Sequence, residues 1–160
     1  MIFRITQKLA KKIDEAPEAA LPPEDNPFRD WHATLFTADR YQYILWMNTP
    51  SLYAIISRGA NIGDSTSFIR RFEAALSASF GEREKFIFNA HISPSLHSFV
   101  FSKISDRSTL GSMNELVYQA RFHLSEEGLS AWDTTDRINE IPMKALGYQF
   151  SREALHGLIK

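Results

Sequence analysis

WHATLFT (Trp31–Thr37), YQYILWM (Tyr41–Met47) and LYAIIS (Leu52–Ser57) follow one another along the chain. The three segments are rich in β-branched and aromatic residues, which is typical of strands. Only Ala38–Arg40 and Asn48–Ser51 separate them, and connections that short favour antiparallel hairpins over parallel crossovers. The second and third segments are nearly continuous apolar runs, so we expect both faces of their sheet to be covered.

Further strands and helices are predicted on either side of this stretch. Ile2–Ile5 reads as a short strand, and His97–Ser105 alternates weakly between apolar and polar residues, as another strand would. A helix opened by Asp64 or Ser65 carries an apolar residue at every fourth position: Phe68, Phe72, Leu76 and Phe80.

The second half of the chain is predicted to be mostly helical. Ser108 would cap a long helix, and Asp133 and Ser151 would open two shorter ones. Together these patterns predict an α+β fold with a mainly antiparallel sheet of about four to five strands and helices packed on it. The core residues expected from this periodicity are Trp31, Leu45, Ile55, Phe72, Leu76, Met113 and Val117.

The chain of 160 residues has the usual size of one domain, so we expect residues 1–160 to form a single domain. Four of the seven prolines fall between Ala16 and Pro27. Because proline interrupts helices and sheet ladders, an irregular and largely exposed proline-rich loop is predicted at about 16–30.

The charge balance bears on partners and location. A formal net charge of −1 argues against a surface devoted to nucleic acid or anionic lipid. The N-terminus carries charged residues from Arg4 onward, so it lacks the apolar stretch of a signal peptide. No apolar run approaches the ~20 residues of a membrane helix. We therefore expect a cytoplasmic protein with no membrane partner. Nucleic acid is the weakest partner class, since glutamates are interspersed among the basic residues Arg70, Arg71, Arg83 and Lys85.

The residue types exclude several chemistries. With no cysteine, thiolate catalysis and cysteine-ligated metal sites are ruled out. The glycine-rich phosphate loops, the zinc-protease motif and the serine-hydrolase elbow are all missing. No two of the five histidines stand at the spacing of a local metal clip, so we expect no metal and no cofactor.

His32 is the first candidate site residue. On a strand, His32 and Thr34 share one face and Trp31 shares the other with Ala33. One interpretation makes His32 an acid–base or ligand-contacting group. The other makes it a half-buried imidazole that is hydrogen-bonded to a neighbour, with Trp31 in the core.

The second candidate is the strand-to-helix junction Asp106–Glu115, DRSTLGSMNE. Gly111 costs a helix about 1 kcal/mol relative to alanine, so its presence needs a reason. One reason is an anion bound at the helix start beside Arg107. The other is close packing of Gly111 against a strand or helix, with Ser108 as a simple cap. The candidate binding residues are His32, Arg107, Ser108, Gly111, Ser112 and Asn114.

Three stretches of the chain resemble the motifs of an uncharacterised bacterial family known only as a domain of unknown function. They are WHA-x-L at Trp31–Leu35, RS-x-LGSMNE at Arg107–Glu115, and N-x-x-PM-x-AL at Asn139–Leu146. The family's motifs read W-H-A-x-L, N-R-S-x-L-G-S-M-N and L-N-x-x-P-M, so this sequence departs at Asp106, where Asn is usual, and at Ile138, where Leu is usual. The resemblance implies a shared fold and no particular activity.

Two functions remain open from the sequence. The first is a non-catalytic binding or regulatory module for a protein partner or a small anionic ligand. The second is a small enzyme acting on a phosphate-bearing or nucleic-acid substrate, with His32 as general base and Arg107 as electrostatic stabiliser. The enzyme requires His32 and Arg107 to converge in one cleft, whereas the binding module does not.

Overall fold

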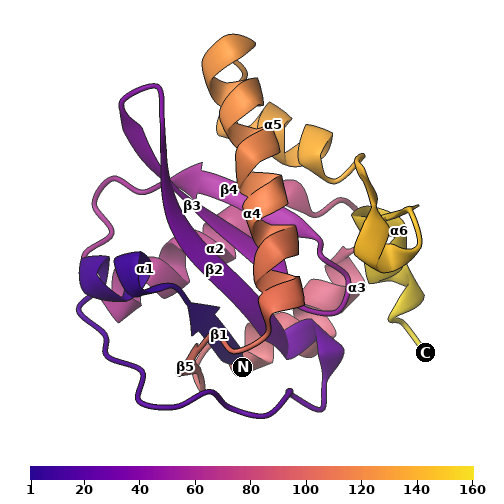
Figure 1. Ribbon diagram of the computed structural model, residues 1–160. Coiled ribbons are helices and arrows are strands. Elements are labelled where there is room, and N and C mark those ends of the chain that lie inside the picture. Colours follow the sequence, from indigo (N-terminus) through magenta and orange to yellow (C-terminus); the bar gives the residue numbers. More distant parts are fainter.

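The fold is built on a five-stranded sheet, described for residues 1–160 by a computed structural model (Figure 1). The strand order is β4-β3-β2-β1-β5. The strands are β1 (Ile2–Ile5), β2 (Asp30–Ala38), β3 (Tyr41–Asn48), β4 (Ala54–Arg58) and β5 (Val100–Lys103). A separate two-stranded ribbon joins β6 (Pro142–Met143) to β7 (Gln149–Phe150).

The sheet is mixed, so the α+β class is confirmed while the expectation of a mainly antiparallel sheet is wrong. Strands β2, β3 and β4 pair antiparallel through the short connections that the sequence predicted. Strand β1, however, pairs parallel to both β2 and β5. Long connections lead from β1 to β2 and from β4 to β5, and such connections can return the chain in the parallel direction.

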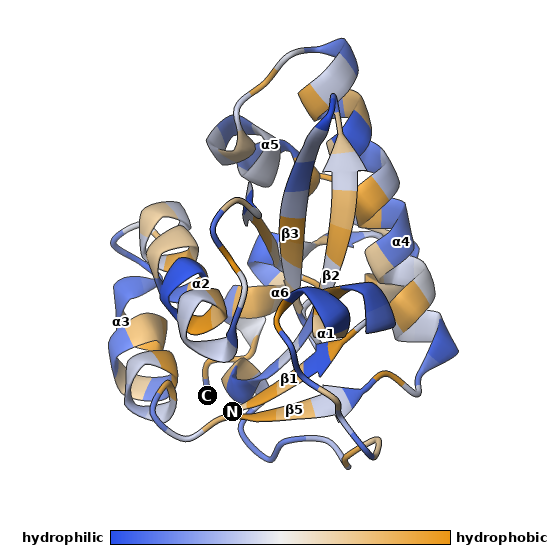
Figure 2. Cartoon of the chain, turned by 90° about the vertical axis from the view of Figure 1, so that its left-hand side faces the viewer, coloured by the Kyte–Doolittle hydropathy of each residue, from blue (hydrophilic) through white to orange (hydrophobic).

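Helices cover both faces of the sheet, as the apolar runs in β3 and β4 predicted. The helices are α1 (Gln7–Lys12), α2 (Ser65–Ser79), α3 (Lys85–Ile87), α4 (Arg107–Arg121), α5 (Ala131–Ile138) and α6 (Ser151–Gly157). In Figure 2, α2 and α3 lie on one side of β2 and β3, and α4 lies on the other. Short π-helical turns extend α3 over Phe88–Ile92 and α4 over Phe122–Glu126.

Each face of the sheet has its own apolar core, and all seven predicted core residues are buried. On the α2 face, Trp31, Ile55, Phe72 and Leu76 belong to a cluster that also takes in α1. On the α4 face, Leu45, Met113 and Val117 belong to a second cluster. Within the five-stranded sheet, this second cluster draws residues from β2, β3 and the β4 side and none from β1 or β5. The parallel edge of the sheet therefore carries no apolar core under α4.

The proline-rich segment between α1 and β2 has no helix or strand before the single 3₁₀ turn Pro27–Arg29. Its prolines 22 and 23 are exposed, as expected. The segment is nevertheless anchored to β5, because the Lys103 N–H donates to the Ala19 carbonyl at 3.0 Å and the Leu21 N–H donates to Ser102 Oγ at 3.0 Å.

Candidate functional site

The parallel edge of the sheet places a buried polar cluster on the face that α4 crosses. Arg4 of β1 lies in register with His32 of β2 and with Ser102 of β5. The carboxylate of Asp30 accepts hydrogen bonds from Arg4 Nε and Nη2, both at 2.8 Å. Arg4 is 6% exposed, Asp30 3% and His32 2%, so this is an ion pair and an imidazole inside the protein.

Thr49 links this ion pair to His32. Its hydroxyl donates to Asp30 Oδ1 at 2.8 Å, and His32 Nδ1 lies 2.9 Å from the same hydroxyl oxygen. Burial alone would raise the pKa of Asp30, but hydrogen bonds from Arg4, from the Glu24 N–H and from Thr49 outweigh it and lower the pKa. The ionised carboxylate takes the only hydroxyl hydrogen of Thr49.

The hydrogen-bond direction fixes the state of the imidazole. Since Thr49 donates to Asp30, it can only accept from His32, and the ring proton therefore sits on Nδ1. His32 Nε2 is left as an acceptor, and it has no hydrogen-bond partner. Burial, with help from the Arg4 charge, lowers the pKa of His32 to about 4, against the opposing charges of Asp30 and Asp106. His32 is neutral at pH 7.

This lowered pKa predicts a loss of stability on mild acidification. The unfolded chain takes up a proton on His32 near pH 6.5, whereas the folded protein does so only near pH 4. Stability is therefore fully present above pH 6.5 and falls between pH 6.5 and 4, by about 3 kcal/mol. The free energy of unfolding, measured by urea titration across this pH range, tests the prediction. The His32→Gln variant should show a flatter pH dependence, while His97→Gln, at an exposed histidine, should show the same dependence as the wild type. An equally steep dependence in His32→Gln would contradict this assignment.

A small cavity of about 140 Å³ opens beside His32. We call it the His32 cavity, and its lining residues are Arg4, Leu21, Pro23, Asp30, His32, Thr49, Ser105, Asp106 and Thr109. Three of them, Ser105, Asp106 and Thr109, come from the junction between β5 and α4. The structure thus brings His32 close to the segment Asp106–Glu115. The residues of that segment that line the cavity are Asp106 and Thr109, which are neighbours of the predicted binding residues and not those residues themselves.

The start of α4 differs from the expected anion site. Asp106, and not Ser108, is the N-cap: its carboxylate accepts the Ser108 N–H at 2.9 Å and the Thr109 hydroxyl at 2.7 Å. These hydrogen bonds, from Thr109 first and then Ser108, lower the pKa of Asp106. The protein's own carboxylate therefore occupies the place that an anion would take at this helix start. Arg107 beside it is exposed, and its side chain makes no hydrogen bond or ion pair.

The remaining predicted residues do not all lie on one surface. Ser108 and Ser112 line a hollow of about 160 Å³, which adjoins the His32 cavity because Thr49 and Thr109 line both. Asn114 lines a larger crevice on another side of α4. Gly111 is exposed, and a Cβ placed there would meet no atom within 4 Å. The close-packing explanation for Gly111 is therefore wrong. Arg107 does not line the His32 cavity, so the convergence of His32 and Arg107 is not present.

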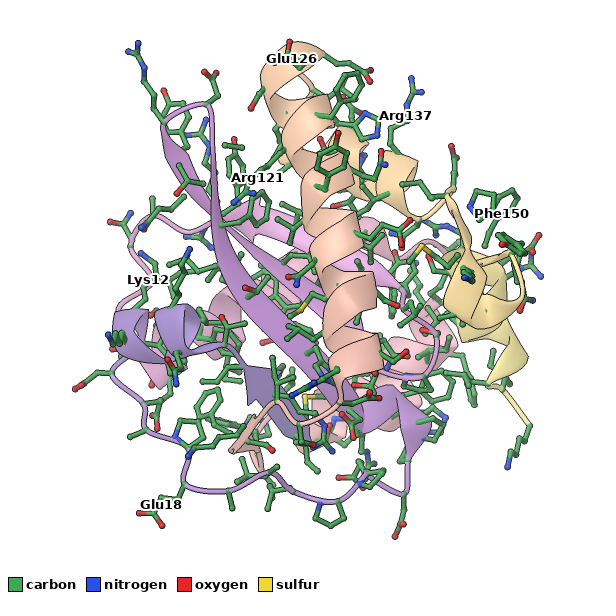
Figure 3. The ribbon with its side chains drawn as sticks, in the orientation of Figure 1. Lys12, Glu18, Arg121, Glu126, Arg137 and Phe150 are labelled. Atoms are coloured by element: carbon green, nitrogen blue, oxygen red, sulfur yellow. The ribbon has the colours of Figure 1, made fainter.

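The larger crevice, which the sequence did not predict, has a volume of about 760 Å³. We call it the β1–β5 crevice; it is lined by Ile5, Thr6, Gln7, Lys8, Thr34, Leu35, Phe36, Lys103, Ile104, Leu110, Asn114, Val117, Tyr118 and Arg121. Its lining contains three cationic residues and no acid. Arg121 lies between α4 and the β2–β3 strands (Figure 3), and its Nε donates to the Thr37 carbonyl at 3.1 Å.

The crevice follows from the strand topology. Strands β1 and β5 are parallel neighbours, so their carboxyl ends, Ile5 and Lys103, lie together. After β1 the chain enters α1, which packs in the core on the α2 face. After β5 it enters α4, which packs on the opposite face. Where adjacent parallel strands send their connections to opposite faces, a crevice forms at the carboxyl ends, and this is where open α/β sheets bind ligands.

A comparison with known families shows which family the chain belongs to, and that family has no assigned activity. A family described as Domain of unknown function (DUF6933) matches residues 2–154. The chain belongs to DUF6933. This confirms the expected membership in a family of unknown function. No curated protein matches the DUF6933 chain. None of its helices combines the length and apolar character that crossing a membrane requires, and no group of three or more histidine or acidic side chains is placed to hold a metal ion.

In this DUF6933 chain, Asn139 of the N-x-x-PM stretch has a structural role. Strand β4 is an edge strand, and the Asn139 side chain takes the place of a further strand beside it. The Ala54 N–H donates to Asn139 Oδ1 at 2.9 Å, and Asn139 Nδ2 donates to the Ala54 carbonyl at 2.7 Å. Thr135 adds a third contact, because its hydroxyl accepts the Ile56 N–H at 3.1 Å. The edge of β4 is thereby closed to other strands.

Removing this amide should destabilise the protein. Asn139→Ala leaves the buried N–H and carbonyl of Ala54 without partners, and each unsatisfied group costs about 1–3 kcal/mol. We expect a loss of about 3 kcal/mol in the free energy of unfolding, measured by urea titration. Asn89→Ala, at an exposed asparagine, is the control and should change stability by less than about 0.5 kcal/mol. Equal losses in the two variants would show that Asn139 does not hold the β4 edge.

Proposed function

We propose that this DUF6933 protein is a non-catalytic binding module whose ligand is a small anion with an apolar part, held in the β1–β5 crevice. The observation that carries the proposal is the charge of the lining: Lys8, Lys103 and Arg121 surround an apolar floor, and no acid is present to neutralise them. Small-molecule sites are typically crevices of about this size that combine apolar walls with a few polar groups, and half of the residues that line this crevice are apolar.

The three cations are available to a ligand. Neither Lys8 nor Lys103 makes a side-chain hydrogen bond or an ion pair, and both are exposed. Arg121 uses only its Nε, on the Thr37 carbonyl, so both Nη groups remain free to bind a carboxylate or phosphate in the paired geometry that arginine favours. Asn114 and Tyr118, on the same side of α4, add hydrogen-bonding groups.

The apolar floor supports a ligand larger than a bare anion. The floor consists of Phe36, Ile104, Leu110 and Val117, which belong to the core on the α4 face or pack against it. Phe36 and Val117 are buried, while Ile104 and Leu110 are half-buried. A hydrocarbon chain or a planar ring placed on them would remove further apolar surface from water, at about 25 cal/mol per Å². An anion without an apolar part would gain only from the charges.

The crevice favours a small ligand over the other classes. A phosphate-directed enzyme of the kind considered from the sequence needs His32 and Arg107 in one cleft, and they do not meet. The segment Asp106–Glu115 offers a protein partner no single surface, since Asn114 lines the β1–β5 crevice while Ser108 and Ser112 line the hollow beside the His32 cavity. We therefore propose the β1–β5 crevice, and not the start of α4, as the place where the anionic ligand binds.

Thermal unfolding with named probes tests this proposal. Adenosine 5′-monophosphate and octanoate each join an anion to an apolar group, and inorganic phosphate lacks the apolar group. At 100 times its dissociation constant a ligand stabilises the folded state by about 2.7 kcal/mol. We expect adenosine monophosphate, octanoate or both to raise the Tm, and inorganic phosphate to do so far less.

Paired variants locate the effect. Lys103→Ala/Arg121→Ala should abolish the rise in Tm, because it removes two of the three crevice cations. Lys144→Ala/Arg137→Ala removes the same charge from exposed residues outside the crevice and should retain the rise. In Figure 3, Arg121 and Arg137 lie on opposite sides of α4. No rise with either amphipathic probe, or an equal rise in both double variants, would contradict the proposal.

A further inference from the structure

The hydrogen-bond donors and acceptors that line the His32 cavity determine which ligand it could bind. Arg4 has five N–H groups, and all are used inside the protein. Nε and Nη2 bind Asp30, Nη1 donates to the Leu21 carbonyl at 2.6 Å and to Ser102 Oγ at 3.5 Å, and Nη2 also donates to the Pro22 carbonyl at 2.9 Å. Arg4 therefore has no donor left for a ligand, and its charge is neutralised by Asp30.

The hydroxyl groups of the lining are also mostly committed. Thr49 donates to Asp30, and Thr109 donates to Asp106. Ser105 is the only lining hydroxyl without a partner. On the acceptor side, His32 Nε2 is buried and unpartnered, and the exposed carboxylate of Asp106 carries a charge that no ion pair neutralises. The cavity thus offers more free hydrogen-bond acceptors than donors. Its lining has a net charge of −1, because the charges of Arg4 and Asp30 cancel and that of Asp106 remains.

We propose that the His32 cavity is a second binding site, which takes the ammonium group of a small primary amine. One N–H of the ammonium donates to His32 Nε2, and its positive charge faces Asp106. A buried imidazole acceptor without a donor costs free energy that such a group would recover. The volume of about 140 Å³ leaves room for only a few non-hydrogen atoms. This site is distinct from the β1–β5 crevice, with which it shares no lining residue.

NMR of the histidine ring protons tests the assignment. The probe is methylammonium chloride, titrated at pH 7.5 against sodium chloride of equal concentration, and the His32 signals are those that disappear in His32→Gln. We expect a saturable shift of the His32 ring signals. Tetramethylammonium, which has the same charge but no N–H, should produce none. The Lys103→Ala/Arg121→Ala variant should bind methylammonium normally, so this result is independent of the crevice.

Two N-cap variants separate the Asp106 charge from its structural role. Asp106→Asn removes the charge, and since asparagine caps helices as well as aspartate does, α4 should persist. We expect methylammonium binding to weaken by about tenfold, because the ammonium loses the negative charge that it faces. Asp64→Asn makes the same change at the N-cap of α2 and should bind as the wild type does. The proposal is overturned if methylammonium gives no saturable His32 shift, if tetramethylammonium matches it, or if Asp106→Asn binds as tightly as Asp64→Asn.

Discussion

Asp30→Ala should lower the free energy of unfolding by about 3–5 kcal/mol, because it leaves the charge of Arg4 buried without its partner. Arg4 would retain only the carbonyls of Leu21 and Pro22 and the Ser102 hydroxyl. Thr49 and the Glu24 N–H would each lose an acceptor as well. Urea titration at pH 7 measures the effect.

The ion pair between Arg152 and Asp136 provides the control for this prediction. It joins side chains that are 32% and 53% exposed, and exposed pairs contribute at most about 1 kcal/mol. Asp136→Ala should therefore cost less than about 1 kcal/mol. If Asp30→Ala costs no more than Asp136→Ala, the buried ion pair does not organise the parallel edge of the sheet.

Phe72→Ala should cost about 3–5 kcal/mol, because it removes an aromatic ring from the centre of the α2-face core. The Phe72 ring lies 5.1 Å from that of Phe3, 5.0 Å from Trp31 and 5.9 Å from Trp46, between ring centroids. It therefore joins α2 to three adjacent strands. A loss below 1 kcal/mol in urea titration would contradict this role, and Phe86→Ala, at a residue that is 58% exposed, should stay below that limit.

The sequence predicted the elements that depend on local pattern. The apolar positions of α2 recur every fourth residue, and Phe68, Phe72 and Leu76 are fully buried. The β2–β3–β4 meander followed from short connections, and Asp64 caps α2 as expected. Such features involve residues close in the chain, which is why periodicity and capping rules could find them.

The parallel pairing of β1 could not be predicted in the same way. Residues 2–5 pair with residues 30–33 and 100–103, and no local pattern states which distant strands a short strand will join. Local rules also fail at the end of α2: the helix stops at Ser79, and the glycine that follows, Gly81, has no positive φ, although glycines at such positions are commonly left-handed C-caps. Glu84 lies in the charged stretch Glu82–Lys85 and yet is buried, because Arg152 and His156 of α6 bind it.

The candidate site was predicted in part. His32 was singled out, and the structure shows a more buried imidazole than the half-buried one expected. Its partners Arg4 and Thr49 come from other strands or turns, so the sequence offered no spacing to connect them. Asp30, however, could have been found from the sequence. It stands two positions before His32 on the same strand, so the two side chains lie on the same face of the sheet.

Lys8, Lys103 and Arg121 illustrate why the crevice could not be predicted. The three residues are scattered along the chain and are brought together only by the parallel β1–β5 pair and by α4. The predicted anion site at the start of α4, by contrast, was local. At that helix start the structure places the carboxylate of Asp106, which accepts the Ser108 N–H.

The central claim is that the β1–β5 crevice holds an anion with an apolar part, and an amide NMR titration tests it most directly. The ¹⁵N-labelled protein is titrated with adenosine monophosphate and with octanoate. We predict saturable shifts concentrated at residues of the crevice, Ile5–Lys8, Leu35, Ile104 and Asn114. Shifts gathered instead around Ala78 and Trp132, which line a separate groove between α2 and α5, or no saturable shifts with either probe, would contradict the claim.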